Sequence, residues 1–181
     1  LNNGPAGTAG YLDATFDALF FLGQHAKAGT DGGNLAHTYS SKSIEYYRIN
    51  GLEMGEFGCR AALAGSYGVP TVFVSGDDKM AAEARALVPG IYCAQVKIGL
   101  GLQLALHLAP EDARDLIRDV AGQATAHIHT IAPYVIAGPP YEQEIMIWAR
   151  TDLAGYLSRG FQQTGPRTMV KRADRLDDLM I

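Results

Sequence analysis

Cysteine is scarce in this sequence. Only Cys59 and Cys93 occur among the 181 residues, and two thiols are too few for the disulfide framework that stabilises small secreted domains. We therefore expect both cysteines to be free or buried thiols, as is usual in a reducing compartment, and we expect a cytoplasmic protein.

Long apolar runs and an excess of basic charge are also missing. No apolar run approaches the roughly 18 residues that a membrane-spanning helix needs, so we do not expect a membrane partner. Asp and Glu (19) outnumber Lys and Arg (15), for a formal net charge of −4, so nucleic acid is not an expected partner either. Apolar residues make up 48% of the chain, as in a globular protein.

Glycine, in contrast, is abundant. The chain contains 21 glycines and 8 prolines, together about 16% of the residues against a usual share of about 12%. Several of the glycines flank the candidate site residues named below. This distribution favours tight turns and backbone making room around a site, and it argues against a bundle of long helices.

Strand and helix patterns alternate between residues 16 and 127. The apolar or β-branched segments that predict strands are residues 16–23, 44–50, 69–76 and 92–97. The segments that predict helices are residues 55–67, 79–87 and 109–127. The first strand segment is almost continuously apolar, so we expect it to be buried on both faces. The alternation predicts an α/β fold with a largely parallel sheet flanked by helices.

The character of the sequence changes after Pro133. Residues 141–148 have the partial alternation of a half-exposed strand, and charges concentrate in the tail. We expect Trp148 to lie in the core or in an interface rather than to stack on a ligand. These features predict an α/β domain over residues 1–132 and a smaller α+β portion over residues 133–181.

Residues that follow predicted strands are the first candidates for a site, because ligands of parallel α/β sheets bind outside the carboxyl ends of the strands. His25, His37 and Glu56 follow such strands. Two imidazoles and a carboxylate are ligands suited to zinc. Asp77 and Asp78 follow a strand as well.

Each candidate also has a simpler structural explanation. Histidines at strand ends often only form hydrogen bonds, and Glu56 is able to complement a helix N-terminus. Asp77 and Asp78 are placed to cap the next helix. His127 and His129 would share one face of an extended segment, but they follow a predicted helix, where capping roles are commoner. The spacing of the residues leaves these alternatives open.

The sequence resembles a known family at this point. The similar segments, in order, are Phe20-Phe21-Leu22-Gly23-Gln24-His25-Ala26, Leu35-Ala36-His37-Thr38, Ile49-Asn50-Gly51, Met54-Gly55-Glu56-Phe57-Gly58, Tyr67-Gly68-Val69-Pro70 and Val74-Ser75-Gly76-Asp77-Asp78. Their order and content resemble the zinc-dependent D-aminopeptidases of the DppA type, peptidase family M55. The resemblance covers most of residues 11–127 and, more loosely, residues 141–148.

The resemblance implies an enzyme and a site. His25 and Glu56 match zinc ligands of the family's two-metal centre, and His37 matches its active-site histidine. The implied reaction is hydrolysis of the N-terminal residue of short peptides that contain D-amino acids, by water activated between two zinc ions. The family also implies homo-oligomers of ring-like form.

One departure from the family pattern concerns the remaining zinc ligands. Family members begin with a strand that ends in Asp-x-Glu, followed later by an Asp-Ser-His segment, and neither occurs in this sequence. We therefore expect the N-terminal portion to be lacking here. A second reading is a catalytically silent α/β subunit for peptide binding or assembly. A third is an unrelated α/β fold, which a large separation of His25 from Glu56 would indicate.

Overall fold

Two β-sheets form the framework of the molecule, which the computed structural model describes over residues 12–179. Sheet A has four strands, and their order is β1-β4-β5-β6. The strands are β1 (Leu19–Gln24), β4 (Thr71–Asp77), β5 (Tyr92–Gly101) and β6 (Leu104–His107). The first three are parallel and β6 is antiparallel. The predicted largely parallel sheet is thereby confirmed.

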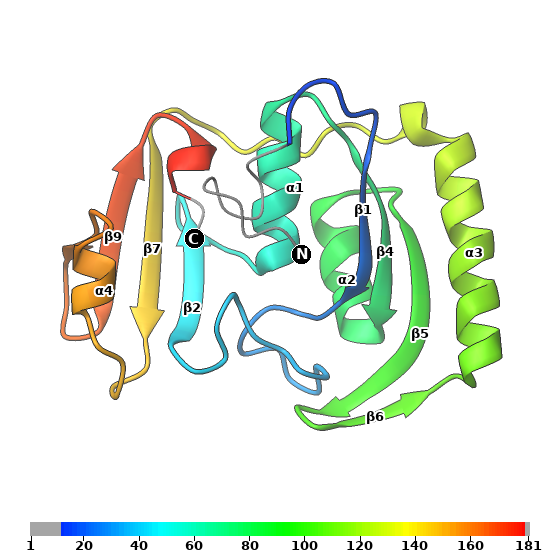
Figure 1. Ribbon diagram of the computed structural model, residues 1–181, viewed down its shortest axis with the longest axis horizontal. Coiled ribbons are helices and arrows are strands. Elements are labelled where there is room, and N and C mark those ends of the chain that lie inside the picture. Colours follow the sequence, from blue (N-terminus) through cyan, green and yellow to red (C-terminus); the bar gives the residue numbers. More distant parts are fainter. Residues whose placement is uncertain (1–11, 180–181) are drawn as a thin grey trace.

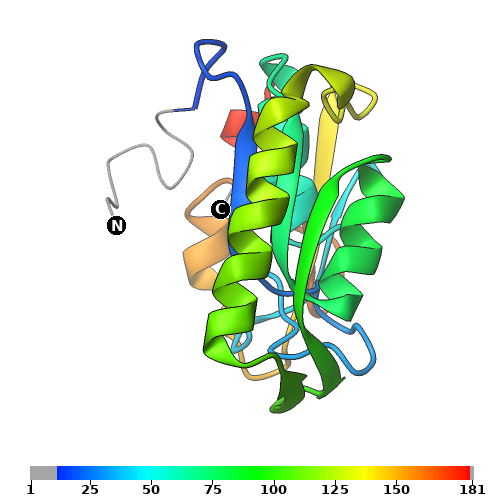
Figure 2. The same cartoon turned by 90° about the vertical axis from the view of Figure 1, so that its right-hand side faces the viewer.

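Three helices flank sheet A on both faces. They are α1 (Glu56–Ser66), α2 (Asp78–Leu87) and α3 (Pro110–Ala126). α3 covers one face, while α1 and α2 lie on the other (Figures 1 and 2). All three helices agree with the predicted segments to within one residue at each end. None of the helices in residues 12–179 has the length and apolar character needed to cross a membrane.

Sheet B has five antiparallel strands in the order β3-β2-β7-β9-β8. The strands are β2 (Ile44–Ile49), β3 (Leu52–Glu53), β7 (Tyr141–Ile147), β8 (Gln162–Gln163) and β9 (Thr168–Ala173). The short helix α4 (Ala154–Leu157) and the 3-10 turns η2 (Ile128–Thr130) and η3 (Leu176–Asp178) complete the described elements. β2 and β3 form a hairpin through Asn50 and Gly51, whose φ angles of 51° and 78° suit a tight two-residue turn.

Sheet B joins strands from distant parts of the sequence. β2 pairs with β7, and Tyr46 donates a hydrogen bond to Glu144, which is 98 residues away along the chain. The predicted boundary at residue 132 therefore separates β2 from β7, the strand with which it pairs across that boundary. The expectation that β2 belongs to the parallel sheet is wrong, because its neighbour is decided by a long-range pairing that no local pattern records.

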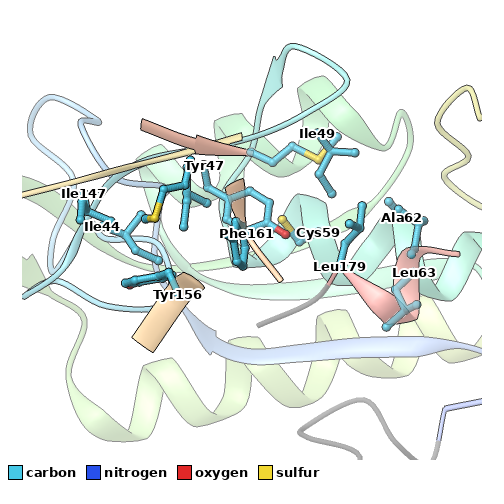
Figure 3. Close-up of a cluster of buried hydrophobic side chains, with 14 residues drawn as sticks. Ile44, Tyr47, Ile49, Cys59, Ala62, Leu63, Ile147, Tyr156, Phe161 and Leu179 are labelled. Atoms are coloured by element: carbon cyan, nitrogen blue, oxygen red, sulfur yellow. The ribbon is translucent and has the colours of Figure 1, made fainter. Parts of the chain in front are cut away.

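Helix α1 lies between the two sheets and is shared by two hydrophobic cores. Phe57 and Ala61 pack in the core of sheet A with Val72 and Phe73. On its other side, Cys59, Ala62 and Leu63 enter the core of sheet B (Figure 3). Eight of its eleven residues are buried. Because α1 is held from both sides, its first residue, Glu56, has a fixed position between the two sheets.

Strand β1 differs from its prediction. Phe20 and Leu22 are 39% and 74% exposed, so the strand is not buried on both faces. β1 lies at the edge of sheet A, where β4 is its neighbour among the described residues. A continuous apolar run predicts burial in the centre of a sheet, but it does not reveal that the strand is at the edge.

Candidate active site

Three predicted site residues converge at the carboxyl end of β1. His25 directly follows β1, His37 lies in the loop between β1 and β2, and Glu56 begins α1. His25 Nε2 lies 3.5 Å from Glu56 Oε1, and His37 Nε2 lies 3.6 Å from the same oxygen. The imidazole rings are stacked with their centroids 3.8 Å apart.

Backbone carbonyls orient both imidazoles. His25 Nδ1 lies 3.1 Å from the carbonyl oxygen of Ala26, and His37 Nδ1 lies 2.7 Å from that of Leu35. A carbonyl only accepts hydrogen bonds, so we assign the proton to Nδ1 in each ring. Each Nε2 lone pair is then free to bind a metal or a proton on the side that faces Glu56.

The carboxylate of Glu56 is held ionised at the centre of the group. The backbone N–H of Tyr39 donates a 2.8 Å hydrogen bond to Glu56 Oε1. Burial by itself would raise the pKa of Glu56, but His25 and this N–H lower it below its ordinary value. For His25, burial by itself would lower the pKa, but the neighbouring Glu56 carboxylate raises it above its ordinary value. Glu56 does occupy a helix N-terminus, and it also faces both histidines.

The group fits a metal ion in donor chemistry and in size. One ligand atom each of His25, His37 and Glu56 lies within 4.8 Å of the other two. Two imidazole nitrogens and one carboxylate oxygen are a donor set that zinc accepts. Their side chains are 18%, 28% and 26% exposed, so the centre is partly shielded while water and substrate still have access. Among residues 12–179, this is the group that meets these criteria.

Glycines make room for this arrangement. A Cβ atom at Gly76 in β4 would lie 2.3 Å from the carbonyl oxygen of Gln24, the last residue of β1. That distance is too short for any side chain, so glycine permits the close approach of β4 to the strand that presents His25. The expectation that glycine makes room near the site is confirmed at this position.

The other sequence candidates have structural roles. Asp77 is fully buried and caps α2, because its Oδ1 accepts the N–H of Met80 at 2.7 Å. Its other oxygen accepts the N–H of Asn34, also at 2.7 Å. The capping prediction for Asp77 is therefore confirmed. His127 stacks on Tyr92 at the end of α3 and lies outside the group around Glu56.

Glu83 is a supporting residue that the sequence reasoning missed. It projects from α2 and accepts the backbone N–H of Lys27 at 2.8 Å, two residues beyond His25. Burial raises its pKa, although the N–H of Lys27 lowers it in part. Glu83 connects α2 to the loop that carries the histidines. In the sequence, Glu83 could have been recognised as a carboxylate three residues after Met80, a spacing that places it on the inward face of α2.

The strand-end loops of this α/β fold bring two imidazoles and one carboxylate together, which is an arrangement able to hold a metal ion. The separation of 3.5 Å between His25 and Glu56 excludes the unrelated-fold reading. The model of the family Peptidase_M55, described as D-aminopeptidase, matches residues 2–180. The chain therefore belongs to this family.

Two relatives agree with the family. A D-aminopeptidase of Bacillus subtilis (strain 168) is 31% identical over 160 residues, which cover 88% of this chain and 55% of the relative. A solved structure, described as the Zn-dependent D-aminopeptidase DppA from Bacillus subtilis, a self-compartmentalizing protease, matches with a TM-score of 0.85 at 28% identity. That match covers 98% of this chain and 64% of the other. The chain thus spans between about half and two thirds of these relatives.

Proposed function

We propose that this chain carries part of the catalytic centre of a zinc-dependent D-aminopeptidase, which removes N-terminal residues from short peptides containing D-amino acids. The convergence of His25 Nε2 and His37 Nε2 on Glu56 Oε1 is the observation that carries the proposal. The family match and the zinc dependence of the similar solved structure support it.

The three residues have separate roles in this proposal. His25 and Glu56 hold zinc, which when bound polarises the peptide carbonyl and lowers the pKa of bound water to about 7. His37 stands beside them, with its Nε2 3.6 Å from Glu56 Oε1. It is placed to transfer a proton or to stabilise the developing oxyanion near the scissile bond. The Leu35 carbonyl fixes the ring of His37, so that Nε2 keeps its direction during the reaction.

A second zinc ion needs further ligands. Zinc usually takes about four ligands, and in this proposal His25 and Glu56 supply two of them, because His37 acts on the substrate. In the proposed two-metal centre, the remaining carboxylates come from the Asp-x-Glu segment of the family pattern, outside this sequence. The two free thiols favour a reducing compartment, and we propose a cytoplasmic protein on that basis.

We also propose that the protein forms homo-oligomers of ring-like form. The β5–β6 hairpin carries an apolar surface, here called the leucine face, whose members are all exposed: Ile98, Leu100, Leu104, Leu106 and Leu108. Ile98 pairs with Leu106 across the hairpin, so both point to the same side. The turn of this hairpin lies at the lower end of the molecule (Figure 1). A contiguous exposed apolar surface of this kind is typical of a protein interface, and the similar solved structure is described as self-compartmentalizing.

Zinc content and hydrolysis, measured together on the complete protein, test the catalytic proposal. We expect His25→Ala and Glu56→Gln to lower bound zinc and to abolish release of the N-terminal residue from D-alanyl peptides. We expect His37→Ala to retain zinc and to lower kcat by about 100-fold or more, as for loss of a general acid or base.

Two outcomes would contradict the proposal. Zinc-loaded wild-type protein that binds peptides without cleaving them would establish the silent-subunit reading. Loss of zinc in His37→Ala would make His37 a metal ligand and would overturn the role assigned to it.

A further inference from the structure

A pocket of about 560 Å³ opens beside His37. Its apolar wall comes from three separate parts of the chain, namely the loop before β2 (Leu35), the β5–β6 turn (Leu102) and the residue after β7 (Trp148). Its volume lies in the range of small-molecule sites. Because His37 itself lines the pocket, whatever binds there lies next to the proposed reaction centre.

Leu35 connects the pocket to the catalytic histidine. It has a φ angle of 57°, a left-handed conformation that bulky residues rarely adopt. Its N–H donates a 2.8 Å hydrogen bond to the carbonyl of Leu102, and its own carbonyl accepts from His37. The side chain is nevertheless 54% exposed. Strained backbone of this kind persists where surrounding contacts enforce it, and here those contacts join the pocket wall to His37.

Trp148 forms another part of the wall. The sequence predicts it in the core or in an interface; its exposure of 41% excludes the core, and it lines the pocket. Its backbone N–H donates to the Ser43 carbonyl, which ties the residue to the start of β2. Leu102 is exposed as well. Large apolar side chains that remain exposed around a concave site favour an apolar ligand.

The charges around the pocket favour the same conclusion. Glu45 is the acidic residue of its lining, and it is paired with Arg167. Its carboxylate is therefore already neutralised and is a poor partner for a cationic side chain. Besides His37, the other polar lining residues are Ser41 and Gln103, which carry no charge.

We propose that this pocket receives an apolar side chain of the peptide next to the scissile bond, and that Leu102 and Trp148 determine which side chains are accepted. The inference rests on the proposed aminopeptidase function. It adds a substrate preference that the metal-binding residues do not explain. The preferred substrates are peptides with a leucine-sized or larger apolar residue beside the cleaved bond.

Kinetics on the complete zinc-loaded protein test the preference. Two peptide series vary one residue from alanine through leucine to phenylalanine, either at the N-terminal position or directly after the cleaved bond. We expect Leu102→Ala and Trp148→Ala to lower kcat/KM for the bulky peptides of one series by about tenfold and to change the alanine peptide much less. Trp148→Phe should retain the preference. Leu157→Ala, an exposed leucine on α4 outside the pocket, is the matched control.

An equal loss of kcat/KM across each series would overturn the inference, because it would indicate a merely structural role. Unchanged kinetics in both alanine variants would overturn it as well. The series that responds identifies which side of the scissile bond the pocket serves.

Fluorescence gives a readout that does not depend on catalysis. Trp148 is the only tryptophan of the sequence, so ligand binding against it changes the emission directly. In EDTA, we expect either D-leucylglycine or glycyl-D-leucine, which carry the apolar side chain on opposite sides of the peptide bond, to give a saturable change that glycylglycine does not give. We expect Leu102→Ala to weaken the binding of that peptide about tenfold. The same response to all three peptides, or none, would contradict the pocket. Binding without cleavage by the zinc-loaded wild type would refute the proposed function while leaving the pocket's apolar preference established.

Discussion

The two cysteines show how far the environment of one residue changes its chemistry. Cys59 on α1 is fully buried between the sheets, where burial raises its pKa to about 12 although Tyr39 and Tyr47 lower it in part. Cys93 on β5 is only partly buried, and burial raises its pKa as well. The sequence predicts two unpaired thiols, which the structure confirms, but it does not distinguish one from the other.

The difference in burial between the two thiols predicts that one is alkylated before the other. Only the thiolate reacts with iodoacetamide, and at pH 8 a thiol with a pKa of about 12 has roughly one molecule in ten thousand ionised, since each pH unit is a factor of ten. We expect Cys93 to be labelled well before Cys59 in the folded protein, as measured by mass spectrometry of peptides. Protein unfolded in urea is the control, in which both should react alike. Equal rates in the folded protein would contradict the environment described for Cys59.

At the scale of elements, the helices follow from the sequence more closely than the strands do. Apolar stripes and local end signals, such as the Asp77 cap of α2 and Pro110 at the start of α3, place the three predicted helices, because these signals lie within one or two turns. Strand β5 extends beyond the predicted segment, to Gly101, and turns back into β6, an element that the sequence reasoning missed. The leucines of this hairpin alternate clearly. However, such alternation shows only that one face of a strand is more apolar than the other. It does not show which strand pairs with its edge.

Two helical glycines should respond oppositely to the same substitution. A Cβ at Gly65 in α1 would lie 1.9 Å from the carbonyl oxygen of Tyr134, whereas a Cβ at Gly122 in α3 meets nothing within 4 Å. We expect Gly65→Ala to lower the free energy of unfolding by about 3 kcal/mol, because backbone must move. Gly122→Ala should raise it by about 1 kcal/mol through helix propensity. Urea denaturation measures both, and a change of the same sign in the two variants would contradict the packing of α1.

The whole molecule consists of two sheets held together by a shared helix. α1 contributes to the cores of sheets A and B, and its first residue meets the histidines that follow β1. The candidate site therefore depends on the packing of both sheets against α1 and not on sheet A alone. The leucine face lies on the far part of sheet A. Substitutions to charged residues there test assembly without disturbing either core.

We expect the double variant Leu104→Glu and Leu106→Glu to lower the molar mass of the complete protein in solution toward that of a single chain. Both residues are exposed, so buried charge and loss of folding are not expected in the isolated chain. Light scattering after size-exclusion chromatography measures the mass, and circular dichroism checks the fold. Val135→Glu, at another exposed apolar residue, is the matched control. An unchanged mass in the double variant would refute the role of the leucine face.

The sequence by itself determined the class of fold, the positions of the helices and the choice of three candidate site residues, which the structure brings together. Each of these depends on local patterns or on short motifs around His25, His37 and Glu56. Tertiary structure alone decided that β2 joins β7, that β1 is at the edge of its sheet, and that Leu35, Leu102 and Trp148 surround one pocket. The physical reason is the distance along the chain over which each kind of signal acts. Local signals depend on neighbours within a few residues, whereas pairing and pocket walls join segments up to about a hundred residues apart, and which of them meet depends on how the whole chain packs.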